Sequence, residues 1–139
     1  MIPIIRATVE NGGVAEMTVT GNSMKPLLLD RVSSVRLAKP DELRIGDIVL
    51  FERESGVYVL HRIAGIKDGV YDMLGDNLST HERGISRESI IAKVQEYNRK
   101  GERWQKNDAA YYAVLPAVRA VRLGGRRIKR LFRRRRKME

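Results

Sequence analysis

The chain has 139 residues, a length that suits one compact domain with an appendage. It has no cysteine and only two histidines, far apart in sequence, so disulfides, cysteine-ligated metals and a paired-histidine metal site are excluded and no cofactor is expected. The net charge of +10 is uneven: residues 1–118 hold 16 basic and 16 acidic residues, whereas residues 119–139 hold 11 basic residues and one acidic residue. The neutral body therefore lacks the basic surface of a nucleic-acid-binding domain.

The body of the chain is predicted to be rich in β-strands. Short apolar or alternating runs are typical of strands, and turn signals such as Asn11-Gly12-Gly13 and Lys67-Asp68-Gly69 separate them. The expected strands cover residues 17–20, 31–37, 47–51, 57–66, 70–74 and 89–97. Runs this short and closely spaced predict a mainly β fold, either a small sheet sandwich or a partial barrel.

The pattern changes after Asn98, where residues 99–102 are predicted to form a turn. Residues 109–132 have helical periodicity, with apolar side chains on one side and arginines on another. Pro116 and Gly124-Gly125 interrupt this pattern, so two short helices are expected rather than one. We therefore expect a β domain over residues 1–98 and a basic amphipathic C-terminal extension over residues 99–139.

The basic extension has three interpretations. Its arginines would attract anionic lipid, and its apolar side, with Leu131-Phe132, favours a membrane surface. A solvated tail and a nucleic-acid contact remain as alternatives, nucleic acid being the least favoured. No apolar segment approaches the roughly 20 residues that a membrane span needs, and Met1–Ile5 lacks the features of a signal peptide. We expect a cytoplasmic protein that can be peripheral on the inner face of the membrane, of unknown oligomeric state.

Three short segments carry the chemistry-bearing residues. Ser23 follows a strand-like stretch and lies between Gly21 and Pro26, so it is expected at a tight corner where backbone N–H groups are close by. His61 falls inside a predicted strand, on the apolar face that also carries Val59. Taken singly, Ser23 is equally consistent with an ordinary turn serine, and His61 with a buried core histidine whose neutral form burial would favour.

The third segment is Gly75-Asp76-Asn77, which follows a predicted strand. Asp76 is predicted either to hold this turn, the slightly favoured role, or to orient His61. Together the three segments supply a hydroxyl, an imidazole and a carboxylate, which are the groups that an activated serine nucleophile requires. His81, the other histidine, lies in a polar stretch and is expected to be solvated.

Read jointly, these segments resemble a known superfamily, the one that joins type I signal peptidases to the self-cleaving SOS-type repressors. The matching segments are GNSMKP, RIGDIVLF, YVLHRIAGI, LGDN and ESIIAKV, in the family's order and spacing from about Met17 to Val94. The resemblance implies a small signal-peptidase-like or repressor-peptidase-like β fold. It also implies Ser23 as the nucleophile and His61 as the general base, as in the histidine branch of the family. Asp76 matches the aspartate of the family's GDN turn.

The resemblance implies a serine endopeptidase that cleaves leader or precursor peptides without a metal or cofactor. The residues around Ser23, namely Gly21, Asn22 and Met24, would contact the substrate or line the oxyanion site. Gly21 replaces a serine usual in signal peptidases, and only Glu82 can stand for a further aspartate of the histidine branch. No transmembrane anchor and no helix-turn-helix precede the serine segment. A non-catalytic peptide-binding module and a self-cleaving, repressor-like peptidase therefore remain as alternatives.

Overall fold

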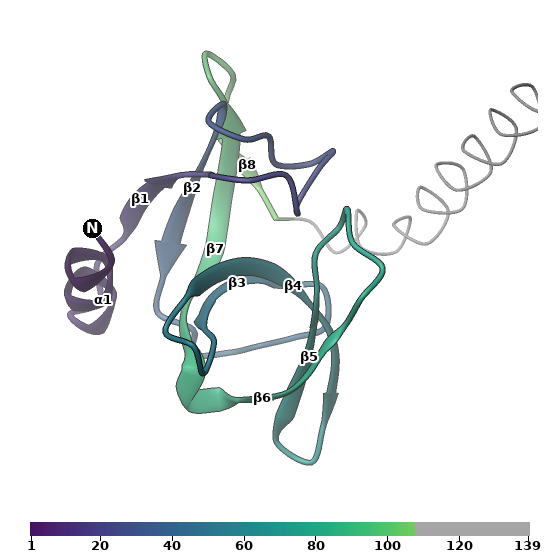
Figure 1. The fold of residues 1–139 in the computed structure, drawn as a ribbon. Coiled ribbons are helices and arrows are strands. Elements are labelled where there is room, and N and C mark those ends of the chain that lie inside the picture. Colours follow the sequence, from purple (N-terminus) through teal and green to yellow (C-terminus); the bar gives the residue numbers. More distant parts are fainter. Residues whose placement is uncertain (108–139) are drawn as a thin grey trace, which may run out of the picture. The chain divides into compact units, whose positions relative to one another are not determined.

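The structure is a computed structural model, and it describes residues 1–107 (Figure 1). Residues Met1–Asn107 form one compact unit. In chain order, its elements are α1 (Ile2–Glu10), β1 (Ala15–Thr18), β2 (Ser33–Ala38), β3 (Ile48–Glu52), β4 (Tyr58–Lys67), β5 (Val70–Leu74), β6 (Glu82–Ser86), the short 3₁₀ helix η1 (Arg87–Ser89), β7 (Ile90–Arg99) and β8 (Gln105–Lys106). The mainly β fold predicted from the sequence is confirmed.

The strands form one antiparallel sheet in the order β1-β2-β7-β3-β4-β5-β6, with β8 paired to β7 (Figure 1). The last long strand of the described chain, β7, lies between β2 and β3, so it joins the β1–β2 pair to strands β3 to β6 in one sheet. Among the strands of residues 1–107, β1 pairs with β2 alone and therefore leaves one edge of the sheet open.

Two hydrophobic clusters lie on opposite faces of the central strands. Adjacent residues of β3 alternate between them: Ile48 and Leu50 belong to the first cluster, whereas Val49 and Phe51 belong to the second. All four are buried, so the uninterrupted apolar run in the sequence reflects a strand that is covered on both faces. The first cluster is the larger one and includes the buried side of α1.

Neither the helix α1 nor the strand β6 was predicted from the sequence. The helix α1 buries Ile5 and Val9, which are four residues apart and so lie on the same side of a helix. That spacing was the available signal. The strand β6 has no fully buried residue and pairs with β5 through its backbone, so its sequence has no apolar periodicity to reveal it.

The compact unit ends later than the expected boundary after residue 98. The strand β7 continues to Arg99, a turn follows, and β8 returns along β7 with Tyr97 opposite Gln105. The boundary lies at Asn107 because this hairpin adds the last strand to the sheet. The predicted helices of residues 109–132 and the basic run lie outside the described residues. Within residues 1–107, no helix has the length and apolar character to cross a membrane.

Candidate active site

Ser23 lies in the long loop between β1 and β2, which contains neither helix nor strand. Gly21 has a φ of +86°, a backbone region that suits glycine, and its N–H donates to Asp30 Oδ1 over 2.8 Å. Met24 is 1% exposed and anchors the loop in the first cluster. The loop is thus held on both sides of Ser23, and Ser23 itself is only partly buried.

The turn that follows β5 docks directly on this serine loop. The backbone N–H of Asn77 donates to the Ser23 carbonyl over 2.9 Å, and Asn77 Nδ2 donates to the Asn22 carbonyl over 3.0 Å. Gly75 lies at the contact: a Cβ at that position would be 2.7 Å from the Ser23 carbonyl oxygen. The structure therefore brings together the GNSMKP and LGDN segments, and only a glycine permits their close approach.

Asp76 is 2% exposed and forms a buried ion pair with Arg62, which is 1% exposed. Its carboxylate accepts from Arg62 Nε at 2.8 Å and from Arg62 Nη2 at 2.9 Å, while Arg62 Nη1 donates to the Gly46 carbonyl at 2.7 Å. This bidentate pair fastens the turn to β4. The Asp76 carboxylate bonds Arg62 and not His61, and within residues 1–107 it accepts no hydrogen bond from a backbone N–H, so it holds the turn through a side chain that was not predicted.

Ser23 lines a largely apolar pocket with a volume of about 480 Å³, within the usual range for ligand pockets. The other lining residues come from α1, from β1 and the loop after it, and from β3 and β4: Met1, Ile2, Met17, Thr18, Val19, Thr20, Met24, Leu50, Tyr58, Val59 and Leu60. The pocket therefore runs beside β1, whose outer edge no other strand of residues 1–107 covers.

The backbone around Ser23 offers donors for a developing oxyanion. No hydrogen bond within residues 1–107 engages the N–H of Ser23 or of Met24. The N–H of Gly21, by contrast, already donates to Asp30 Oδ1. Of the predicted neighbours of the nucleophile, Met24 lines the pocket, while Gly21 and Asn22 shape the loop.

His61 is enclosed on the face of β4 that meets the second cluster. Its side chain is 3% exposed, and its ring centroid lies 6.0 Å from that of Phe51. Nδ1 is buried without a hydrogen bond, and the nearest carboxylate is Glu82, with Oε1 at 3.6 Å. The carboxylate that the sequence suggested as a stand-in for the histidine branch's aspartate is therefore the one beside the imidazole.

Glu82 is shared between His61 and Arg53. Arg53 Nε lies 3.1 Å from Oε1 and 3.0 Å from Oε2 of Glu82, and Arg53 Nη2 also contacts Oε1. Hydrogen bonding to Arg53 holds the pKa of Glu82 below its usual value, and the same bond raises the pKa of Arg53. Burial lowers the pKa of His61; Glu82 acts to raise it, Arg53 to lower it further and Asp76 to raise it. The net direction favours the neutral imidazole, the form that a general base needs.

Ser23 and His61 are not joined by a hydrogen bond in this structure of residues 1–107. In the β3–β4 pairing, His61 lies opposite Val49, a residue of the second cluster. Leu50 and Leu60, which meet Ser23 in its pocket, belong to the first cluster. The serine loop and the imidazole therefore lie on different faces of the β3–β4 pair, and no hydrogen bond joins them within residues 1–107.

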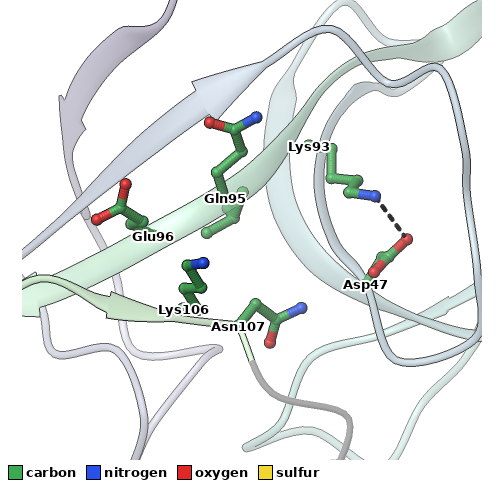
Figure 2. Close-up of a pocket in the computed structure, with 7 residues that line it drawn as sticks. Asp47, Lys93, Gln95, Glu96, Lys106 and Asn107 are labelled. Atoms are coloured by element: carbon green, nitrogen blue, oxygen red, sulfur yellow. Dashed lines mark ion pairs between the residues drawn. The ribbon is translucent and has the colours of Figure 1, made fainter.

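A second pocket, of about 410 Å³, is lined mostly by charged and amide residues (Figure 2). Lys93 and Asp47 form an ion pair at one side of it, with 3.5 Å between Nζ and Oδ2 (Figure 2). Asp47 also accepts from the Arg44 N–H over 2.8 Å, so it stabilises the turn before β3. None of the residues predicted for the active site lines this pocket. Within residues 1–107, no group of three or more acidic or histidine side chains is placed to hold a metal ion.

Two residues of the site were missed in the sequence. Arg53 and Arg62 were not predicted to have a role, yet each binds a carboxylate of the site. Arg62 follows directly after His61, and an arginine inside an otherwise apolar strand was the signal for a buried partner.

Comparisons of the chain with protein-family models, with curated proteins and with solved structures find no match.

Proposed function

We propose that the protein is a serine endopeptidase in which Ser23 attacks the peptide carbonyl and His61 is the general base. The observation that carries this proposal is the apolar pocket lined by Ser23 beside the open edge of β1. An extended peptide can add to such an edge through backbone hydrogen bonds while an alternate side chain enters the pocket. The pocket's composition favours an apolar side chain of a leader or precursor peptide.

In the proposed reaction, the Ser23 hydroxyl forms a bond to the carbonyl carbon as its proton passes to Nε2 of His61. The N–H groups of Ser23 and Met24 stabilise the negative charge on the carbonyl oxygen. The tetrahedral intermediate collapses as the amine leaves with the proton from His61, and water activated by His61 then hydrolyses the acyl-enzyme. Because Ser23 and His61 lie against different clusters, the reaction requires the serine loop to move toward His61 when peptide fills the pocket, so that the two side chains form a hydrogen bond.

The resemblance to signal peptidases and SOS-type repressors supports the proposal at the level of motif order. The carboxylate of Glu82 beside Nδ1 of His61 supports it at the level of geometry, because a carboxylate in that position favours the tautomer with a basic Nε2. The neutral imidazole that burial favours is the third support.

A second candidate function is a non-catalytic module that holds extended peptides in the same pocket. The observation that favours it is the absence, within residues 1–107, of a hydrogen bond between Ser23 and His61, the latter being almost fully enclosed. The two functions differ in turnover. The module would bind peptides equally well as wild type and as Ser23→Ala, and would cut none of them.

The test is a mass-spectrometric cleavage profile on a mixed peptide library, run with wild type, Ser23→Ala and His61→Gln after each is shown to be folded. We expect specific cuts by wild type, reduced by a factor of roughly 10²–10⁴ or more in both variants. Ser55→Ala, in an exposed turn, and His81→Gln, at the other histidine, are the matched controls and should cut like wild type. Cuts that persist in Ser23→Ala would refute the assignment of the nucleophile.

The location belongs to the same proposal: a cytoplasmic protein that its basic extension attaches to anionic lipid on the inner membrane face. The support is compositional, since residues 119–139 hold 11 basic residues and one acidic residue. Co-sedimentation with anionic vesicles, beside a DNA duplex-binding assay, should show vesicle binding that is lost when the chain ends at Asn107. Duplex binding without vesicle binding would refute this part.

A further inference from the structure

The side chains of Glu82 and Arg53 lie next to the Nδ1 edge of the His61 imidazole, away from Nε2, the nitrogen proposed to act as the base. His61 comes from β4, Glu82 is the first residue of β6, and Arg53 lies in the turn between β3 and β4. Both backbone polar groups of Arg53 are hydrogen-bonded: its N–H donates to the Val57 carbonyl and its carbonyl accepts from the Gly56 N–H, each over 2.8 Å. The guanidinium thus projects from a rigid hairpin turn.

The position of the Glu82 carboxylate depends on Arg53. The Glu82 side chain is 25% exposed, so packing alone does not immobilise it. A bidentate guanidinium–carboxylate pair has a planar geometry that sets the carboxylate's orientation as well as its distance. The pairing of β5 with β6 is irregular between Tyr71 and Met73, the latter opposite Glu82, and such irregularities re-aim side chains. Held in this way, Oε1 faces Nδ1 of His61 at 3.6 Å.

The two charges have opposite effects on His61. A carboxylate opposite Nδ1 favours the tautomer with the proton on Nδ1, which leaves the lone pair on Nε2. The same carboxylate would also stabilise an imidazolium, which cannot act as a base. The positive charge of Arg53 offsets that second effect. Asp76 is the remaining charged group that acts on the ring, and its own carboxylate is paired with Arg62.

We propose that Arg53 is a positioning residue: it holds the Glu82 carboxylate opposite Nδ1 of His61 and offsets its charge, so that the imidazole stays neutral with Nε2 as its basic nitrogen. The catalytic meaning of this arrangement rests on the proposed peptidase function. The arrangement itself does not, so it can be tested on the folded protein without a substrate.

The experiment is an NMR titration of the full-length chain with ¹⁵N-labelled histidine, in wild type, Arg53→Gln, Arg53→Lys and Glu82→Gln. The His81→Gln variant assigns the two histidines. We expect Nδ1 to carry the proton in wild type. Arg53→Gln should raise the pKa of His61, because the repelling charge is lost while the glutamine amide can still donate to Glu82, and Glu82→Gln should lower that pKa. Arg53→Lys keeps the charge but loses the bidentate geometry of the guanidinium. It should therefore leave the pKa of His61 near its wild-type value and increase the share of the tautomer with the proton on Nε2.

Arg44→Gln is the matched control, because Arg44 forms an exposed ion pair with Glu42, and its loss should leave His61 unchanged. A shift in Arg53→Gln no larger than in this control, or a downward shift, would overturn the proposal. A wild-type imidazole with its proton on Nε2 would overturn it as well.

The pH profile of kcat/KM connects the arrangement to catalysis. If wild type cleaves peptide, the acid limb of its profile should move to higher pH in Arg53→Gln, following the pKa of His61. An unmoved limb would refute the role of Arg53 and leave the peptidase standing. No cleavage by any protein would refute the peptidase and the catalytic meaning of Arg53, and the NMR shifts would then decide the arrangement alone.

Discussion

The imidazole of His61 is subject to opposing influences, because burial disfavours its charged form and Glu82 favours it. Burial is the larger influence, so the pKa of His61 in the folded protein lies below that of the unfolded chain. The unfolded chain therefore binds a proton at a higher pH than the folded protein does. The contribution of His61 to the free energy of unfolding is fully present above the ordinary histidine pKa of about 6.5 and is lost as the pH falls below that value.

This linkage predicts that His61→Phe, which keeps a ring beside Phe51 but cannot titrate, has a flatter stability profile than wild type between pH 7.5 and pH 5.5. Urea unfolding at several pH values measures it. Glu82 acts in a separate, more acidic window: its pKa is lowered by folding, so its contribution is present above its unfolded value and is lost as the pH falls through the folded value. Identical slopes for the two proteins above pH 5.5 would contradict the shift assigned to His61.

The Arg62–Asp76 pair is the other residue-scale feature with a clear energetic consequence. Both side chains are almost fully buried, and each satisfies the other's charge. Arg62→Met should cost about 3–5 kcal/mol in the free energy of unfolding, because it leaves a buried carboxylate without a partner. The double variant Arg62→Met/Asp76→Leu should lose less than the sum of the single losses.

Chemical denaturation of wild type, Arg62→Met, Asp76→Leu and the double variant completes this double-mutant cycle. Arg44→Met is the control, since the Arg44–Glu42 pair is exposed and such pairs contribute about 1 kcal/mol or less. Additive losses in the double variant would mean that Arg62 and Asp76 do not stabilise each other.

At the scale of elements, the site depends on the contact between the turn after β5 and the loop after β1. The Asn77 N–H and the Ser23 carbonyl form the link, and Gly75 provides the space for it. A Cβ on Gly75 would be 2.7 Å from the Ser23 carbonyl oxygen, which is backbone and cannot rotate away. The two segments would therefore have to separate.

Gly75→Ala is accordingly predicted to destabilise the protein by about 1–3 kcal/mol. It should also weaken peptide cleavage, or peptide binding, beyond what the stability loss explains. Gly65→Ala is the matched control, because a Cβ there would meet Asp72 at an ordinary distance of 3.5 Å. Urea unfolding and the cleavage profile, run side by side, measure both effects. Equal behaviour of the two alanine variants would show that the close approach at Gly75 is not needed.

Prediction of the elements succeeded where a strand buries apolar side chains. The strand β4 was expected over residues 57–66 and covers Tyr58–Lys67, with His61 on the expected face beside Val59 and Ile63. Prediction failed at β6, whose residues are all at least partly exposed, and at β8, whose two residues are both exposed. Backbone hydrogen bonds between strands leave no periodic trace in the sequence.

At the scale of the whole molecule, the sheet and both hydrophobic clusters lie within Met1–Asn107. A chain that ends at Asn107 should therefore fold alone, with a free energy of unfolding within about 0.5 kcal/mol of the full chain. Overlaid amide spectra and urea unfolding of the two chains measure this. A truncated chain with collapsed or missing amide signals would show that the first unit needs the rest of the chain.

The β-rich body, the confinement of the net positive charge to residues 119–139 and the candidate groups Ser23, His61 and Asp76 could all be derived from the sequence alone. These properties are local, since they depend on periodicity, turn residues and composition. Which groups meet became clear only in the folded chain: Asp76 with Arg62, Glu82 with His61, and Asn77 with the serine loop. Those contacts depend on strand order and register, because a slip of one residue would send the side chain of His61 to the opposite face of β4.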